Sequence, residues 1–133
     1  MKSTISFRVR YQETDQMGIV HHSVYLIWFE AGRTEWMREF GLTYRNCEEK
    51  GWLLPLVESG TKYHKPARYD DLVEVETTLL SCDKVLFEFE YVVRCEGEIL
   101  TTGFTKHVCV DKNYKISREG TNLLKNIFCA EDR

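Results

Sequence analysis

Residues 24–40 form the segment that most limits how this chain can fold. Their apolar side chains recur at spacings of three and four, which predicts one long helix. One face carries Val24, Ile27, Trp28, Ala31 and Glu35, and an adjoining face carries Tyr25, Phe29, Trp36 and Phe40. Ser23 is expected to cap the start of this helix, and Gly41 is expected to end it. A helix that is apolar over so much of its circumference needs other elements wrapped around it.

The rest of the chain is mostly strand, which can supply that wrapping. Alternating or β-rich stretches predict strands at residues 4–11, 52–66, 72–82, 85–95 and 98–110. Only Asp83-Lys84 and Glu96-Gly97 separate the last three, so these strands are expected to pair as antiparallel hairpins. Short helices are expected at 43–50 and 118–129. One long helix against an antiparallel sheet of about five strands is an α+β fold.

Length and charge define the class of molecule. The 133 residues contain no repeat or linker, so residues 1–133 are expected to be a single domain. The 18 Lys and Arg against 21 Asp and Glu give a net charge of −3, which argues against nucleic acid as a partner. Long strands would leave sheet edges open in a monomer, so we expect a homo-oligomer, either a dimer or a homotetramer.

The cysteines and the apolar runs indicate the cellular compartment of the protein. The five cysteines, without any Cys-x-x-Cys pair, are Cys47, Cys82, Cys95, Cys109 and Cys129. Free thiols in a reducing compartment are therefore expected, rather than a zinc site or a disulfide framework. The sequence shows no secretory signal and no run near the ~20 apolar residues of a membrane span. We therefore expect a soluble cytoplasmic protein without a membrane span.

The residues able to do chemistry gather between the first strand and the long helix. The segment YQETDQMGIVHHSVY contains Tyr11, Glu13, Asp15, His21 and His22. The helix that follows begins with open N–H groups and the positive end of its dipole. A carboxylate before it can cap the helix, or it can act on a carbonyl whose oxygen rests on those N–H groups. Spacing alone favours the capping interpretation.

A wider pattern resembles the active-site region of hotdog-fold acyl-CoA thioesterases. Tyr11, Asp15, Gly18, His22 and Tyr25-Leu26 follow the signature of the 4-hydroxybenzoyl-CoA thioesterase family, in particular its YbgC-type bacterial branch. The stretches FEAGRTEW and HKPARYDD are also similar to that family's central helix and to the start of its third strand. The resemblance covers roughly residues 4–125. It implies a hotdog fold, in which an antiparallel sheet wraps a long central helix.

The family implies an assignment for each site residue. Asp15 would be the catalytic carboxylate, acting either as nucleophile or as general base toward water. The backbone N–H of His22 would hold the thioester oxygen in an oxyanion hole, and Tyr11 also counts in the site. Gly18 would let the loop approach the substrate and is the substrate-binding candidate. A thioester is already electrophilic and thiolate leaves readily. No metal is therefore expected, and no cofactor beyond the coenzyme A of the substrate.

The other polar residues receive structural roles or none. Glu13 is expected to face solvent, and His21 to be an ordinary loop residue. Glu30 and Arg33 are expected to pair on the helix because they lie at i, i+3. Glu30 is also the second choice of catalytic carboxylate, since some hotdog thioesterases use a carboxylate on this helix. His107 has no informative spacing and is assigned no role.

Three functions stay open. The first is hydrolysis of acyl-CoA to free acid and coenzyme A. The second is a hydratase or dehydratase acting on acyl thioesters, which Asp15 and His22 fit superficially, although the His-Phe-Pro-Gly dehydratase pattern is absent. The third is a non-catalytic module that binds acyl groups or acyl carrier protein, because a fold does not determine function. The presence of both Asp15 and His22 argues against that last function, since nothing structural requires both.

Overall fold

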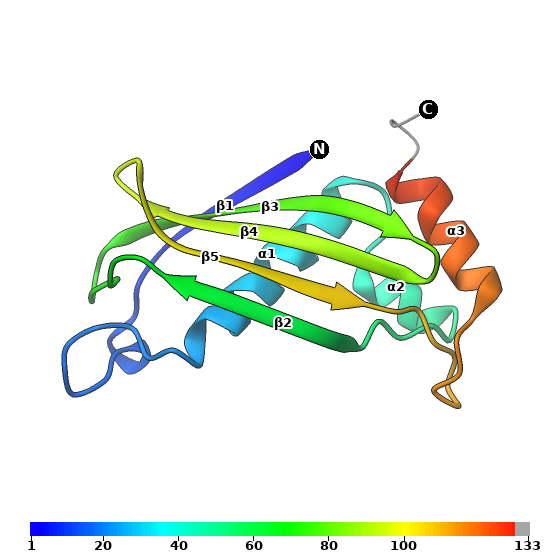
Figure 1. The fold of residues 1–133 in the computed structure, drawn as a ribbon, viewed down its shortest axis with the longest axis horizontal. Coiled ribbons are helices and arrows are strands. Elements are labelled where there is room, and N and C mark those ends of the chain that lie inside the picture. Colours follow the sequence, from blue (N-terminus) through cyan, green and yellow to red (C-terminus); the bar gives the residue numbers. More distant parts are fainter. Residues whose placement is uncertain (130–133) are drawn as a thin grey trace.

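Five antiparallel strands form one sheet in the computed structural model, which describes residues 1–129. The strands are β1 (Lys2–Arg8), β2 (Leu56–Tyr63), β3 (Leu72–Asp83), β4 (Leu86–Cys95) and β5 (Glu98–His107). Their order in the sheet is β1-β3-β4-β5-β2, so β1 and β2 form its two edges (Figure 1). The helix α1 (Val24–Glu39) crosses one face of this sheet. The α+β class and the five strands are confirmed.

The two predicted hairpins form the centre of the sheet. β3 pairs with β4 and β4 pairs with β5, as the short connectors indicated. Both turns use left-handed backbone, with φ of 54° at Lys84 and 52° at Glu96. The two outer strands come from distant parts of the chain, because β1 pairs with β3 and β2 pairs with β5.

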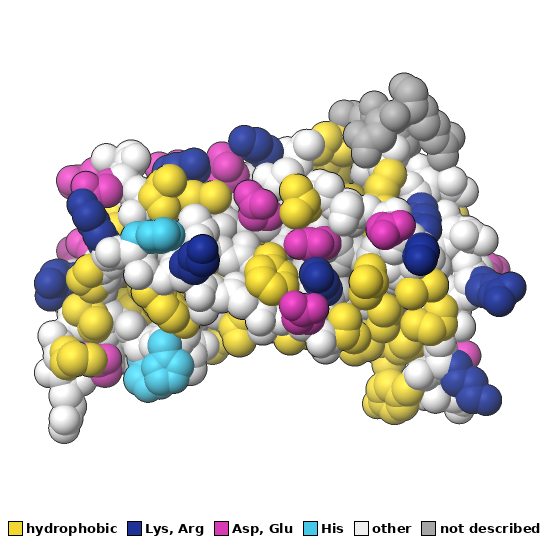
Figure 2. Space-filling model, viewed as in Figure 1, with side chains coloured by type: hydrophobic (Ala, Val, Ile, Leu, Met, Phe, Trp, Pro, Cys, Tyr) yellow, Lys and Arg dark blue, Asp and Glu magenta, His cyan; other side chains and the backbone are white. Residues whose placement is uncertain are grey.

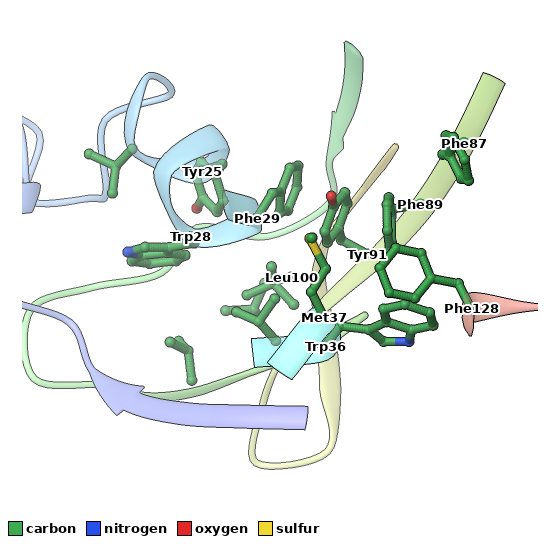
Figure 3. Close-up of a cluster of buried hydrophobic side chains, with 14 of the residues drawn as sticks. Tyr25, Trp28, Phe29, Trp36, Met37, Phe87, Phe89, Tyr91, Leu100 and Phe128 are labelled. Carbon is green, nitrogen blue, oxygen red and sulfur yellow. The ribbon is translucent and has the colours of Figure 1, made fainter. Parts of the chain in front are cut away.

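The inner face of α1 packs aromatic side chains against the sheet. Its buried residues are Val24, Tyr25, Trp28, Phe29, Gly32, Trp36 and Met37. The ring of Phe29 stacks on Tyr91 with centroids 4.4 Å apart, and Trp36 meets Phe89 edge-on at 5.3 Å (Figure 3). Burying a large apolar side chain contributes roughly 1.5–3 kcal/mol. This interface is therefore a major source of the stability that holds α1 in place.

The helix is not wrapped on every side, which corrects the expectation from its apolar faces. Leu26 and Ile27 of α1 are 41% and 59% exposed. Leu56 and Val57 of the edge strand β2 are 46% and 53% exposed. The sheet covers one face of the helix, so a single chain leaves these apolar side chains in contact with water.

The start of α1 differs from the expectation, whereas its end agrees. Gly41 (φ 127°) follows the last turn and confirms the predicted stop. Ser23 already has helical backbone angles, and its side chain does not cap the first turn. The prediction of a Ser23 cap was wrong because the chain turns helical one residue earlier. The shorter helices α2 (Tyr44–Glu49) and α3 (Arg118–Phe128) lie close to the predicted ranges. None of the helices within residues 1–129 is long and apolar enough to span a membrane.

Two cysteines form a disulfide, which contradicts the expectation of free thiols throughout. Cys82, near the end of β3, is bonded to Cys129, the residue that follows α3, across a separation of 47 residues. Cys47, Cys95 and Cys109 are free thiols. Only the packing of α3 near the end of the sheet brings this pair together, so spacing along the chain could not predict it.

The face of the sheet away from α1 is exposed to solvent and carries both charged and apolar side chains. Figure 2 shows acidic and basic side chains interspersed on the visible surface. Arg94 pairs with Glu76 at 3.4 Å, and Lys106 pairs with Glu58 at 3.5 Å. Exposed pairs of this kind contribute at most about 1 kcal/mol each. An antiparallel sheet with one apolar and one solvated face needs helices on one side only, as the structure has them.

Candidate active site

The loop between β1 and α1 is a compact, hydrogen-bonded turn. It begins with a 3-10 turn at Tyr11–Glu13 and doubles back over residues 14–20. The Asp15 N–H donates to the Ile19 carbonyl at 2.8 Å, and the Gly18 N–H donates to the Asp15 carbonyl at 3.0 Å. Gly18 has a φ of 80°, and a Cβ placed there would meet nothing within 4 Å. Glycine is therefore needed for the backbone conformation of the turn rather than for space around it.

Asp15 presents its carboxylate on this turn. Its Oδ1 accepts a hydrogen bond from the Met17 N–H at 2.8 Å, which holds the side chain against its own turn. The Asp15 side chain has no other hydrogen bond within residues 1–129, so the second carboxylate oxygen is open to a reactant. Asp15 is half-buried and lines an open hollow of about 690 Å³. The other lining residues are Tyr11, Gln12, Thr14 and Gln16.

His22 lies two residues before the first residue of α1. Its side chain is exposed and packs on the ring of His21, with centroids 4.1 Å apart. The Val24 N–H donates to the His21 carbonyl at 3.0 Å, and the Ser23 N–H donates to Nδ1 of His21 at 3.1 Å. His21 therefore organises the start of the helix, a role that its spacing did not indicate. The His22 backbone N–H has no acceptor in the described part of the chain, so a ligand can use it at the positive end of the helix dipole.

Glu13 is buried, which contradicts the expectation that it faces solvent. Its Oε1 accepts from the Arg10 N–H at 2.8 Å, and its Oε2 accepts from Trp28 Nε1 at 2.9 Å and from Arg10 Nη2 at 3.3 Å. Because Trp28 belongs to α1, this carboxylate ties the loop to the helix. Burial raises the pKa of Glu13. The hydrogen bonds from Arg10 and Trp28 and the charge of Arg10 outweigh burial, and they hold the pKa below its ordinary value of 4.5.

A second tether joins the same turn to the segment before β3. The Val20 N–H donates to the Ala67 carbonyl at 2.9 Å, and Ile19 forms an isolated bridge with Arg68. Arg68 is held in turn by its own N–H, which donates to the Asp71 carboxylate at 2.8 Å. The motif around residue 68 and the loop around residue 15 are therefore adjacent in space. Two independent contacts fix the position of the Asp15 turn.

The structure brings some of the predicted site residues together, but not all of them directly. Tyr11 and Asp15 line the same hollow, where Tyr11 is 78% exposed and its ring meets Tyr69 edge-on at 5.8 Å. Within residues 1–129, no hydrogen bond joins Asp15 to His22. The described residues also contain no group of three His, Cys, Asp or Glu side chains able to hold a metal ion. A substrate, rather than a direct contact, would have to bridge the carboxylate and the helix start.

A known protein family matches most of this chain, including the loop at Asp15. The family model described as "Thioesterase-like superfamily" matches residues 9–120, which is most of the chain and includes the whole Asp15 turn. The chain belongs to the thioesterase-like superfamily. The matched residues include the polar loop 11–22, which joins β1 to α1.

Several known proteins are similar to this chain over most of their own length. YneP of Bacillus subtilis (strain 168) is 39% identical over 105 residues, which are 78% of this chain and 76% of YneP. The acyl-CoA thioester hydrolase YbgC of Escherichia coli O6:H1 is 30% identical over 105 residues, covering 78% of each protein. The crystal structure of a DHNA-CoA thioesterase from Staphylococcus aureus has a TM-score of 0.86 at 28% identity, covering 98% of this chain and 86% of that one. The hotdog fold that the motifs implied is confirmed.

One expectation about the central helix of this thioesterase-like chain is wrong. Glu30 and Arg33 do not pair, because no ion pair within 4.0 Å involves Arg33 among residues 1–129. Arg33 Nη1 instead donates to the hydroxyl of Tyr91 at 3.1 Å. The i, i+3 spacing permits a pair on the helix, but it gives no information about a strand side chain 58 residues away. His107, which was assigned no role, is buried beside the same part of the core.

Proposed function

We propose that this chain hydrolyses acyl-CoA thioesters to a free acid and coenzyme A, with Asp15 as the catalytic carboxylate. The observation that carries the proposal is the Asp15 carboxylate held by the Met17 N–H on a turn tethered to the start of α1, where the His22 N–H is open. The printed names of YbgC and of the DHNA-CoA thioesterase support the reaction class. Tyr11 would contact the substrate from the same hollow, and Gly18 would allow the turn to lie against it.

In the proposed reaction the thioester carbonyl oxygen accepts a hydrogen bond from the His22 N–H. The Asp15 carboxylate takes a proton from a water molecule while the water oxygen bonds to the carbonyl carbon. The tetrahedral intermediate then collapses, the C–S bond breaks, and the departing thiolate receives the proton that Asp15 held. One oxyanion donor contributes about 3–4 kcal/mol to such a transition state. A placed base contributes roughly 10²–10⁴-fold in rate.

Asp15 has a second possible role as nucleophile. Its carboxylate would attack the carbonyl carbon and expel the thiolate, and water would then open the resulting mixed anhydride. After a single turnover in ¹⁸O-water, label found in Asp15 would identify the nucleophilic role. General-base catalysis places the label only in the released acid, whereas water attack on the aspartyl side of an anhydride places it in Asp15. Either role would use the second oxygen of Asp15, because Oδ1 is already held by the Met17 N–H.

We also propose that the chain works as a homo-oligomer, either a dimer or a tetramer. The support is the open edge of β2 and the exposed apolar side chains of Ile27 and Val57. Light scattering coupled to size-exclusion chromatography should give a mass two or four times the 15.7 kDa of one chain. A mass of one chain over the working concentration range would contradict this part of the proposal.

The direct test is release of free thiol from acetyl-, hexanoyl-, palmitoyl- and benzoyl-CoA by the purified protein. Thioester hydrolysis predicts release from at least one of them. Hydration of crotonyl-CoA without thiol release would instead indicate a hydratase. Saturable binding of acyl-CoA without any turnover would indicate a binding module, and turnover of acyl carrier protein thioesters alone would identify acyl carrier protein as the partner.

A further inference from the structure

A continuous chain of hydrogen bonds runs through the core beside α1. Arg33 Nη1 lies 3.1 Å from the Tyr91 hydroxyl, which lies 2.6 Å from Oγ1 of Thr105. Nε2 of His107 lies 2.9 Å from the same Thr105 oxygen, and Nδ1 of His107 lies 3.2 Å from the Leu54 carbonyl. Figure 3 shows Tyr91 among the buried aromatic side chains.

The chemical groups at the two ends determine which atom donates and which accepts in every bond of this hydrogen-bond chain. A guanidinium can only donate and a carbonyl can only accept. Arg33 therefore donates to Tyr91, and His107 donates from Nδ1 to Leu54. In a neutral His107, Nε2 must then accept from the Thr105 hydroxyl, which in turn accepts from the Tyr91 hydroxyl. All four side chains are satisfied by one arrangement of protons.

The three side chains that link the ends of this hydrogen-bond chain, Tyr91, Thr105 and His107, are neutral near pH 7. Burial raises the pKa of Tyr91, so its hydroxyl keeps its proton. Burial, together with the charge of Arg33, lowers the pKa of His107 to about 4, so its imidazole is uncharged. The hydrogen-bond chain therefore holds the Arg33 guanidinium in place without neutralising its positive charge.

The charge of Arg33 is also not balanced by an ion pair in the described part of the chain. No carboxylate oxygen of residues 1–129 lies within 4.0 Å of its guanidinium nitrogens. Arg33 is half-buried, where a cation without a counter-charge is costly. A guanidinium that is fixed in position and uncompensated is suited to bind an anion, in particular a planar one.

A pocket of about 430 Å³ opens at this guanidinium. That volume falls in the range of small-molecule sites. Its walls include Arg33, Glu30, Tyr44, Leu54, Leu56 and His107. Within one chain, this pocket shares no lining residue with the hollow at Asp15. One cation beside apolar side chains selects an anion that carries an apolar chain.

We propose that this pocket binds an organic carboxylate on a short apolar chain. The carboxylate would accept hydrogen bonds from the Arg33 guanidinium, and the chain would lie against Leu54 and Leu56. Two sources could supply that chemistry: a free carboxylic acid, or an acyl-CoA whose acyl chain ends in a carboxylate.

Glu30 is the one acidic side chain of the pocket, and it opposes a bound anion. It is exposed, whereas Arg33 is half-buried. Water and salt screen an exposed charge more effectively than a half-buried one, so the attraction to Arg33 outweighs the repulsion from Glu30. The proposal therefore predicts effects of opposite sign for these two residues.

The first test is calorimetric titration of the full-length protein with hexanoate and with hexanamide, its uncharged counterpart. Hexanoate is expected to bind at least about tenfold more tightly than hexanamide. Arg33→Gln should remove that preference, and Glu30→Gln should tighten hexanoate by about two- to threefold. Equal binding of acid and amide, or an unchanged preference in Arg33→Gln, would overturn the proposal.

If Arg33→Gln does not fold, two other variants take its place. Arg33→Lys should keep part of the preference for hexanoate, because it retains the charge without the planar fork. Tyr91→Phe removes the hydroxyl that holds Nη1, so it should weaken hexanoate several-fold and leave hexanamide unchanged. An unchanged acid-to-amide ratio in both variants would also overturn the proposal.

A second titration distinguishes the two sources of the carboxylate. The Asp15→Asn protein is titrated with adipoyl-CoA and with hexanoyl-CoA, which differ in the terminal carboxylate. A preference for adipoyl-CoA that disappears in the Asp15→Asn, Arg33→Gln double variant identifies the acyl chain as the source. Equal binding of the two thioesters, with hexanoate binding still dependent on Arg33, identifies a free acid. The hexanoate result does not depend on turnover, so it stands even if the chain proves not to hydrolyse thioesters.

Discussion

Replacing Glu13 by glutamine should destabilise the protein although the side-chain shape is kept. Glu13 accepts three hydrogen bonds, one from the Arg10 N–H and two at its other oxygen from Trp28 and the Arg10 guanidinium. Glutamine has one acceptor oxygen and one donor NH₂ group. Whichever way the amide turns, its NH₂ faces an N–H donor.

The expected loss of unfolding free energy in Glu13→Gln follows from those contacts. A hydrogen bond to a charged group contributes about 1.5–3 kcal/mol. At least one such bond is lost and the others lose the negative charge of their acceptor. The free energy of unfolding should therefore fall by about 2–4 kcal/mol. Glu39→Gln, an exposed acid at the end of α1, is the matched control and should change it by less than about 0.5 kcal/mol.

Urea unfolding at fixed protein concentration, followed by tryptophan fluorescence, measures this quantity. A double-mutant cycle with Trp28→Phe isolates the contact between loop and helix and should give a coupling energy of about 1–2 kcal/mol. A loss below about 0.5 kcal/mol for Glu13→Gln, or a coupling energy near zero, would refute the argument that Glu13 ties the loop to α1.

The same carboxylate predicts a pH dependence with a definite sign. The pKa of Glu13 is held below its ordinary value of 4.5 in the folded protein. Its contribution is therefore fully present above that value and is lost as the pH falls through the folded pKa. The difference in unfolding free energy between the wild type and Glu13→Gln should be constant from about pH 6 to 8 and shrink below about pH 4.5. A difference that grows toward acid would contradict the direction of the shift.

Three further predictions follow from single features. Gly18→Ala should cost about 1 kcal/mol, because alanine resists a φ of 80° although its methyl group meets no atom; an unchanged urea midpoint would show that the turn relaxes. Cys82→Ser should lower the unfolding free energy of the oxidised protein by about 4 kcal/mol, from the chain entropy of a 47-residue loop, and the difference should disappear with reductant. His22→Ala should reduce turnover less than loss of Asp15 does, since the backbone N–H remains; an equal loss would show that the imidazole takes part.

Much of the fold could be predicted because its signals are local. The period of residues 24–40 and the glycine at 41 define α1 without reference to the rest of the chain. The two-residue connectors specify the central hairpins in the same way. The positions of β1 and β2 could not be derived, because both depend on pairing with strands far along the chain. The exposure of Ile27 was missed for a related reason: a pattern shows that a face is apolar, but not whether one chain covers it.

For the site too, local features could be predicted from the sequence, whereas contacts between distant residues could not. The polar loop and the offset from Asp15 to His22 are visible in the sequence, and the structure places them at the start of α1. Glu13 and Arg33 were misjudged because their partners, Trp28 and Tyr91, lie 15 and 58 residues away. In a sequence, a buried acid looks the same as a solvated one. Only the fold supplies the donors that make its burial stable.

The most direct test of the central claim is the turnover number of Asp15→Asn for the acyl-CoA that the wild type hydrolyses best. Asparagine keeps the side-chain volume and removes the charge, so turnover should fall by at least about 100-fold while the fold and assembly stay unchanged. Asp83→Asn, at the exposed end of β3, is the matched control and should keep wild-type turnover. Near-normal turnover in Asp15→Asn, or its loss in Glu30→Gln instead, would contradict the assignment of Asp15 as the catalytic carboxylate.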